Sequence, residues 1–107
     1  MKNAEQLDKK TIYKMTKGQD RHALSTLKGE EFTPDAYLFY SYKNNAGETV
    51  DALSLLINGE VYTTSSEPVI NSFNDIVDAF DDEDVMLTMI GRTSKSGREY
   101  NVLDVVL

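Results

Sequence analysis

The feature that most constrains the fold is a change of hydrophobic period in the middle of the chain. Three segments rich in aromatic, β-branched and aliphatic residues follow one another at residues 36–43, 49–58 and 60–64. In the second segment, Leu53, Leu55 and Ile57 alternate with the period of two that is typical of a strand facing a core. The loop at residues 44–48 and the Asn58-Gly59 turn contain residues that accept positive φ. The pattern therefore predicts three consecutive antiparallel strands.

From Ser66 onward the period becomes 3.6, which indicates an amphipathic helix. The residues of its apolar stripe are Val69, Ile70, Phe73, Ile76, Val77 and Phe80. Ser66 or a neighbour caps this helix, and Pro68 lies in the first turn, where a missing N–H costs little. The acidic run of residues 81–84 ends the helix, because carboxylates at a helix C-terminus oppose its macrodipole.

The last pattern is a hairpin over residues 85–107. Its apolar, strand-forming parts, residues 85–90 and 99–107, flank a small, polar and basic turn at residues 91–98. The element order is then three strands, a helix and two strands, which is the order of an OB-fold barrel. We predict a mainly β protein with an OB-like five-stranded antiparallel barrel and one helix between strands 3 and 4. An open sheet backed by one helix is the structural alternative.

The N-terminal part is less regular than the rest. We interpret residues 1–14 as a polar extension and residues 15–107 as a single OB-like domain. The residues of 11–16 favour a short strand, and Lys17-Gly18-Gln19-Asp20 favours a turn. Residues 23–27 favour one helical turn, because it brings the two leucines of this segment together at positions i and i+3.

Charge is distributed unevenly along the 107 residues, whose net charge is −7. Residues 1–28 hold seven Lys and Arg against three acids, residues 29–91 hold one against thirteen, and residues 92–107 hold three against two. Basic ends and an acidic middle allow an anion-binding face on a protein that repels anions elsewhere. The chain has no cysteine, no apolar run of the ~18 residues that span a membrane, and no hydrophobic signal core. We therefore expect a cytoplasmic protein that does not bind membranes.

Two kinds of side chain predict a nucleic-acid-binding surface, although a charged hairpin turn is by itself more often simply solvated. Clustered cations can follow a phosphate backbone, and exposed tyrosines on strands offer rings on which bases stack, worth about 1–3 kcal/mol per base. The predicted binding residues are Lys17, Arg21, Tyr42, Lys43, Tyr62, Arg92, Lys95, Arg98 and Tyr100. Three phenylalanines, Phe39, Phe73 and Phe80, are assigned to the core instead.

Nothing in the sequence indicates catalysis, a metal or a cofactor. The only histidine, His22, has no nucleophile paired with a base and no ligand spacing around it, and no loop has the Walker pattern. We therefore expect a protein that is not an enzyme. The acidic run of residues 81–84 lacks the spacing of a Ca²⁺ loop. It is either a solvated loop or a mimic of DNA phosphate for a basic partner.

Several short motifs resemble the small single-stranded DNA-binding proteins of tailed bacteriophages. Residues 94–100, Ser-Lys-Ser-Gly-Arg-Glu-Tyr, are similar to the segment that precedes the last strand of that family. Residues 59–62, Gly-Glu-Val-Tyr, resemble one of its strands, and residues 73–76, Phe-Asn-Asp-Ile, resemble part of its helix. Residues 15–18, Met-Thr-Lys-Gly, look like its usual beginning. The resemblance covers residues 15–107 in order and spacing, whereas residues 1–14 and 81–84 have no counterpart in it.

The resemblance implies a protein that coats single-stranded DNA during phage replication or recombination, in the cytoplasm of the host bacterium. It implies backbone contacts for Lys95 and Arg98, base stacking for Tyr62 and Tyr100, and replication or recombination proteins as further partners. The alternative function is a phage-encoded inhibitor whose acidic middle mimics nucleic acid toward a host nucleic-acid-binding protein. A small β-barrel module with a protein ligand is a third hypothesis.

Overall fold

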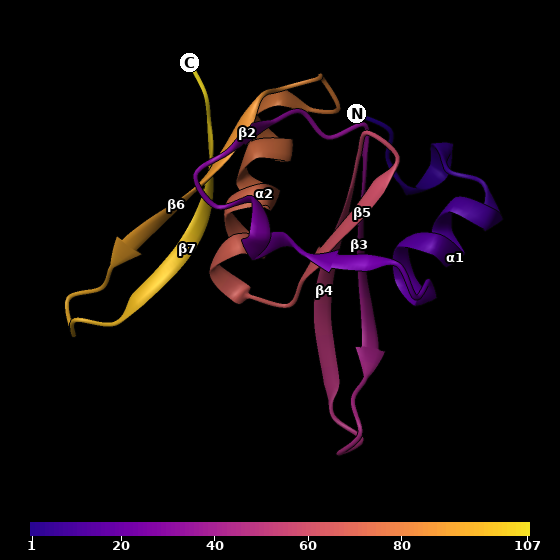
Figure 1. Cartoon of the computed structure of the whole chain (residues 1–107), viewed down its shortest axis with the longest axis horizontal. Helices are drawn as coiled ribbons and strands as arrows, with labels where there is room; N and C mark the ends of the chain where they lie inside the picture. Colours follow the sequence, from indigo (N-terminus) through magenta and orange to yellow (C-terminus); the bar gives the residue numbers. More distant parts are fainter.

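The computed structural model describes all 107 residues and shows a mainly β protein with two sheets (Figure 1). The first sheet has the order β1-β5-β4-β3, with β1 at Arg21–Ala23, β3 at Ala36–Lys43, β4 at Thr49–Ile57 and β5 at Glu60–Thr64. The second has the order β2-β6-β7, with β2 at Glu31–Phe32, β6 at Leu87–Thr93 and β7 at Glu99–Val105. The helices are η1 (Ala4–Gln6), α1 (Lys9–Lys17), η2 (Leu24–Leu27) and α2 (Glu67–Phe80).

The three predicted consecutive strands are confirmed as β3, β4 and β5, which pair in antiparallel order. Leu55 stands opposite Tyr37 on one side and Tyr62 on the other. The turn between β4 and β5 places Asn58 and Gly59 at φ values of 51° and 81°, the left-handed region that this pair tolerates. The alternating side chains of β4 are buried as expected, because one face of the strand packs into the main core.

The predicted helix is confirmed as α2. Its residues Val69, Phe73 and Ile76 are buried, and the remaining apolar residues of the stripe pack at the margin of the core. A proline stands in the first turn as predicted, but the side chain of Ser66 makes no capping hydrogen bond. The helix ends at Phe80, and Asp81 takes a φ of 54°. The acidic run is therefore a loop, as the macrodipole argument requires.

The predicted five-stranded closed barrel is not what the structure shows. Seven strands form two separate sheets, and the consecutive strands β2 and β3 belong to different ones. The chain changes sheet at Thr33–Asp35, where Pro34 is fully buried. On the other side of the molecule, β1 pairs in parallel with the edge of β5. Strands of two or three residues have too few positions to show a period of two, so the sequence pattern did not reveal β1 or β2.

The strand predicted over residues 11–16 is wrong, because these residues belong to α1. The side chain of Asp8 caps this helix by accepting a hydrogen bond from the Thr11 N–H at 2.8 Å. Met15 is then fully buried against Leu38 and Val61 on the face of the first sheet opposite to α2. The alternation of residues 11–16 is ambiguous, whereas an Asp at position 8 is a specific signal for the start of a helix. The helical turn predicted over residues 23–27 is confirmed as η2.

The N-terminal residues contact the rest of the chain, and one phenylalanine differs in placement from the sequence interpretation. Residues 1–14 lie against the domain: Lys2 forms a parallel bridge with Ala36, and α1 covers the first sheet. Phe39, which was assigned to the core, leaves 37% of its surface exposed. Its ring lies at the margin of the core, with its centroid 5.8 Å from that of Phe73. Neither helix combines the length and the apolar character that crossing a membrane requires.

Candidate nucleic-acid interface

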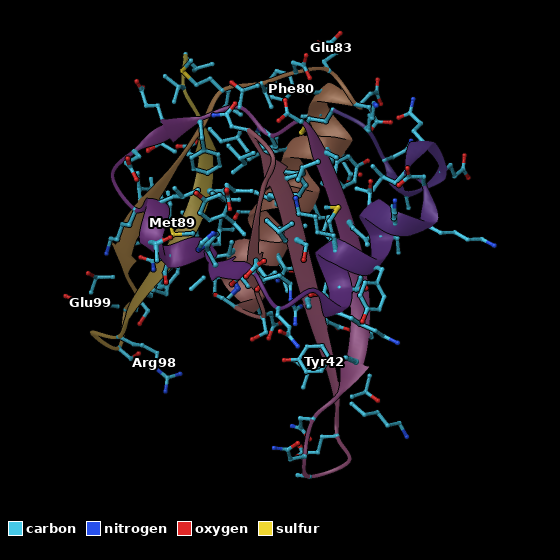
Figure 2. All side chains as sticks on the ribbon, turned by 45° about the vertical axis from the view of Figure 1, so that its right-hand side comes forward. Tyr42, Phe80, Glu83, Met89, Arg98 and Glu99 are labelled. Atoms are coloured by element: carbon cyan, nitrogen blue, oxygen red, sulfur yellow. The ribbon has the colours of Figure 1, made fainter.

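Two hairpins project from the body of the protein, one toward the bottom and one toward the left of the view in Figure 1. One joins β3 to β4 and the other joins β6 to β7, and in the view of Figure 1 both tips lie in the lower half. Figure 2 shows Tyr42 and Arg98 toward this end, whereas Phe80 and Glu83 lie at the opposite end. The segment that follows α1, including β1, crosses between the two hairpins.

A groove of about 990 Å³ occupies the space around this segment. Its walls come from the end of α1, from β1, from β3 and β4, from the residues after β5, and from Met89 and Asn101 of the second hairpin. Nineteen residues line it, and none of them is Asp or Glu, although the chain contains 18 acids. Its charged and aromatic lining side chains are Lys17, Arg21, His22, Tyr40 and Tyr42. An anion in this groove would therefore meet positive charge and no carboxylate.

The guanidinium of Arg21 is oriented by hydrogen bonds that leave its charge unneutralised. Its Nε donates to the Gly18 carbonyl at 2.8 Å, and its Nη1 donates to the Tyr40 hydroxyl at 3.2 Å. The buried Ser54 hydroxyl lies 3.2 Å from the same Tyr40 oxygen. Ser54 is itself held in place because its hydroxyl donates to the Met15 carbonyl at 2.6 Å. The two ion pairs of the structure involve other residues. Because a guanidinium has five donors, the remaining ones stay available to a ligand.

Tyr40 and Tyr42 form an aromatic surface beside Arg21. They stand two residues apart on β3 and therefore share one face of the sheet. Their ring centroids are 6.4 Å apart with an angle of 36° between the planes. Tyr42 is 45% exposed, whereas Tyr40 is half-buried and held by its hydroxyl. A half-exposed tyrosine at the wall of a cationic groove has the geometry on which an unpaired base stacks.

The second hairpin carries three exposed cations without carboxylate partners: Arg92, Lys95 and Arg98. Its turn is closed by hydrogen bonds from the Ser94 N–H to the Arg98 carbonyl at 2.8 Å and from the Gly97 N–H to the Ser94 carbonyl at 2.9 Å. Arg92 stands directly opposite Tyr100. The alternation of side chains places this pair on the face away from the core, and Met89 and Asn101 on the face toward the groove.

Eight of the nine predicted binding residues fall into three places. Lys17, Arg21 and Tyr42 line the groove. Arg92 and Tyr100 line a smaller cavity of about 400 Å³ beside it. The hairpin tips, outside both cavities, hold Lys43, Lys95 and Arg98.

Tyr62 is separate from the others. It packs at the margin of the main core with its ring centroid 5.2 Å from that of His22, and it lines neither cavity. His22, in turn, lies with its Nε2 2.9 Å from an Oε2 of Glu60. A role for Tyr62 in stacking together with Tyr100 required β5 to lie near the second hairpin. In the structure β5 lies between β1 and β4.

The acidic run lies at the other end of the molecule and is bound into the fold. The carboxylate of Asp82 accepts hydrogen bonds from the Tyr37 hydroxyl at 2.6 Å and from the Asn3 side-chain amide at 2.8 Å. The hydrogen bond from Tyr37 is the main reason that the pKa of Asp82 lies below its ordinary value. Burial, aided by the same carboxylate, raises the pKa of Tyr37 to about 12. Asp84 pairs with the Met1 amino group at 2.7 Å.

Sequence reasoning missed several residues that line the two cavities. Tyr40 could have been found, because the period of two places it beside Tyr42. The sequence interpretation used Lys28 only as the end of a helical turn, and it gave no role to Asn101, which lines both cavities. Lys28 and Asn101 come close to each other because the segment after β1 crosses to β6, and no local sequence pattern predicts this crossing.

No group of three or more His, Asp and Glu side chains is arranged to hold a metal ion. Comparison of the chain with protein-family models, with curated proteins and with solved structures gave no match.

Proposed function

We propose that this protein binds single-stranded DNA, largely without sequence preference, in phage DNA replication or recombination. The observation that carries the proposal is the groove between the two hairpins. It is lined by Lys17, Arg21 and two tyrosines and by no carboxylate, in a chain whose net charge is −7. A protein with this overall charge repels a polyanion, so a groove lined by cations and by no carboxylate favours the approach of nucleic acid there.

In the proposed complex the cations bind phosphates and the tyrosines bind bases. Lys17 and Arg21 neutralise phosphates at the groove wall, and Tyr42 stacks on a base. Cations at the hairpin tips, including Lys95 and Arg98, hold the strand from either side. Phosphate contacts and stacking carry no base code, so the binding is sequence-tolerant and falls steeply with salt. A duplex keeps its bases stacked inside and cannot offer them to Tyr42.

Two further observations support the proposal. The order of β3, β4, β5, α2, β6 and β7 is that of an OB-fold, and the loops after β3 and after β6 are those that OB-folds use to bind oligonucleotides. Here the hairpins that carry these loops border the groove (Figure 1). The sequence motifs that resemble phage single-stranded DNA-binding proteins include the basic turn of the second hairpin.

The experiment that tests the proposal is a fluorescence anisotropy titration of labelled oligo-dT at low and moderate salt, with a duplex of equal length as control. We expect salt-sensitive binding to the single strand alone. The double variant Lys95→Ala/Arg98→Ala should bind more weakly at unchanged thermal stability, whereas Lys9→Ala/Lys10→Ala on α1 should bind as the unaltered protein does. Absence of oligo-dT binding at low salt would refute the proposal.

The same titration separates this function from the alternative of an acidic nucleic-acid mimic, because a mimic ignores DNA. A mimic would need the carboxylates of the acidic run to be free for a partner, and the structure leaves fewer of them free than the sequence suggests. Asp82 and Asp84 are engaged within the molecule, so that only Asp81 and Glu83 of the acidic run make no side-chain hydrogen bond or ion pair.

A further inference from the structure

Gly91 lies inside β6 for a reason other than backbone conformation. Four of the six glycines have positive φ, and Gly18 ends α1 at a point where a side chain would meet a backbone carbonyl. Gly91 has neither feature and stands in a regular antiparallel pair with Asn101. Glycine within a strand costs stability relative to other residues, and it often marks a place where another group approaches the backbone closely.

The group that approaches Gly91 is the ammonium of Lys28. A side-chain carbon at position 91 would lie 3.1 Å from the Lys28 Nζ and 3.5 Å from its Cε. The backbone of Lys28 is fixed there by its bridge to Met89 and by the hydrogen bond from the Gly29 N–H to the Met89 carbonyl at 3.3 Å. The Oδ1 of Asn101 is 3.9 Å from the same position. The lysine therefore lies over a bare stretch of strand, beside an amide.

This arrangement borders the smaller cavity, of about 400 Å³, at the base of the second hairpin. Lys28 and Arg92 line it, and neither belongs to an ion pair of the structure. Glu99 is its single carboxylate. Asn101 lines both this cavity and the groove, so the two spaces meet at its side chain. An anionic chain that lies in the groove can continue past Asn101 toward Lys28 and Arg92.

We propose that Lys28 and Gly91 form a seat for a backbone phosphate of single-stranded DNA, at the point where the strand passes from the groove toward the second hairpin. The inference rests on the proposed function and extends it, because it sets the direction in which a longer strand runs. A compact ammonium beside a strand position without a side chain suits a phosphate.

The test is a ladder of labelled oligo-dT of about 4 to about 20 nucleotides, a range that brackets the ~4–16 nucleotides bound by one OB-fold. Affinities are measured over a salt series for the full chain and for Lys28→Gln and Gly91→Ala. Lys10→Gln, an exposed lysine of α1 outside both cavities, is the matched control. Circular dichroism melts establish that each variant is folded.

For long oligonucleotides, Lys28→Gln should reduce the slope of log Kobs against log salt by about 0.7, the value for one phosphate contact on a single strand. For the shortest oligonucleotides, which the groove alone accommodates, its affinity should equal that of the unaltered protein. Gly91→Ala should weaken the long complexes by less than Lys28→Gln does, because the added methyl group shifts the ammonium without removing its charge. The flexible end of a lysine can move aside, so this variant should remain folded.

Two results would overturn the inference while the proposed function stands. One is an unchanged salt slope in Lys28→Gln at every length. The other is an equal loss at all lengths, which would place Lys28 within the groove rather than beyond it. If the unaltered protein binds no oligonucleotide, the proposed function fails and this inference fails with it. If Gly91→Ala does not fold, the slope of Lys28→Gln decides.

Discussion

The two ends of this molecule treat their charges in opposite ways. At the end with the hairpin tips, cations face solvent or the groove and have no carboxylate partner. At the other end, two of the four acids of residues 81–84 are held by groups of the fold itself, Asp82 by Tyr37 and Asn3, and Asp84 by the Met1 amino group. Figure 2 shows the separation, with Arg98 and Glu83 on opposite sides.

The comparison teaches that a charged stretch of sequence does not reveal by itself whether it serves the fold or a ligand. A carboxylate that accepts two hydrogen bonds is already satisfied, and removing it disturbs the structure. An exposed cation without a partner adds little to stability, so its removal tests binding alone. Substitutions at the cationic end should therefore change binding, and substitutions at the acidic end should change stability.

The largest expected effect is a loss of oligo-dT affinity when a stacking ring at the cationic end is removed. Tyr42→Ala should raise the Kd for oligo-dT about 5- to 150-fold, because stacking on one aromatic side chain is worth about 1–3 kcal/mol. The melting temperature should hardly change, since the ring is 45% exposed. Tyr13→Ala, which removes a 63% exposed ring from α1, is the control and should bind normally. Equal losses in both variants would contradict a specific role of Tyr42.

The next effect is on the salt dependence of binding. Lys17→Ala combined with Arg21→Gln should reduce the slope of log Kobs against log salt by about 1.4, since each phosphate contact on a single strand contributes about 0.7. Anisotropy titrations at several salt concentrations measure it, with Lys9→Ala/Lys10→Ala as the charge-matched control. A slope equal to that of the unaltered protein would remove the groove from the binding site.

At the acidic end we expect the reverse pattern, an effect on stability without an effect on binding. Asp82→Asn should lower the melting temperature, because it loses the charge that strengthens the hydrogen bonds from Tyr37 and Asn3. Asp81→Asn, a neighbour that makes no such bonds, should melt as the unaltered protein does. Oligo-dT affinity should stay within about twofold in both variants, because the loop lies far along the molecule from the groove and surface charges are screened over about 10 Å. A loss of affinity in Asp82→Asn would contradict the separation between an acidic end that stabilises the fold and a cationic end that binds DNA.

The smallest expected effect is on stability at alkaline pH, and it comes from the hydrogen bond between Tyr37 and Asp82. The pKa of Tyr37 is raised from 10.0 to about 12, so the folded state holds its proton over a range where the unfolded state has lost it. This contribution to the free energy of unfolding is complete below pH 10 and is lost as the pH rises through about 12. Urea unfolding at several pH values measures the decline, and Tyr37→Phe should remove that component of it.

For Asp82, the partner in this hydrogen bond, the contribution to stability is lost at low pH instead of at high pH. The pKa of Asp82 lies below its ordinary value of 3.8, chiefly because of the Tyr37 hydroxyl. The stabilisation is present above pH 3.8 and is lost as the pH falls through the lowered pKa. Asp82→Asn should therefore flatten the pH dependence of the unfolding free energy below pH 3.8, and an unchanged profile would show that the contact does not contribute.

The sequence by itself determined the elements whose periodicity extends over several residues. The boundaries of β3 and β5 agree with the prediction, and those of β4 and α2 agree within a residue or two. These segments could be predicted because five or more consecutive positions repeat the same pattern of burial. The basic turn and the acidic run were equally visible, since they are local runs of charge.

Only the tertiary structure decided how these elements are arranged. β1 and β2 are too short to show a period, yet each adds an edge strand to one of the two sheets. α1 was missed for a local reason, because the alternation of residues 11–16 was read as a strand and the Asp8 cap was overlooked. Tyr62 and Tyr100 both looked like surface rings, but the pairing of β5 places Tyr62 beside His22 at the margin of the core. The seat at Gly91 needs Lys28, which lies 63 positions earlier in the chain. Contacts of this kind follow from strand pairing across the chain, and no local pattern of residues records them.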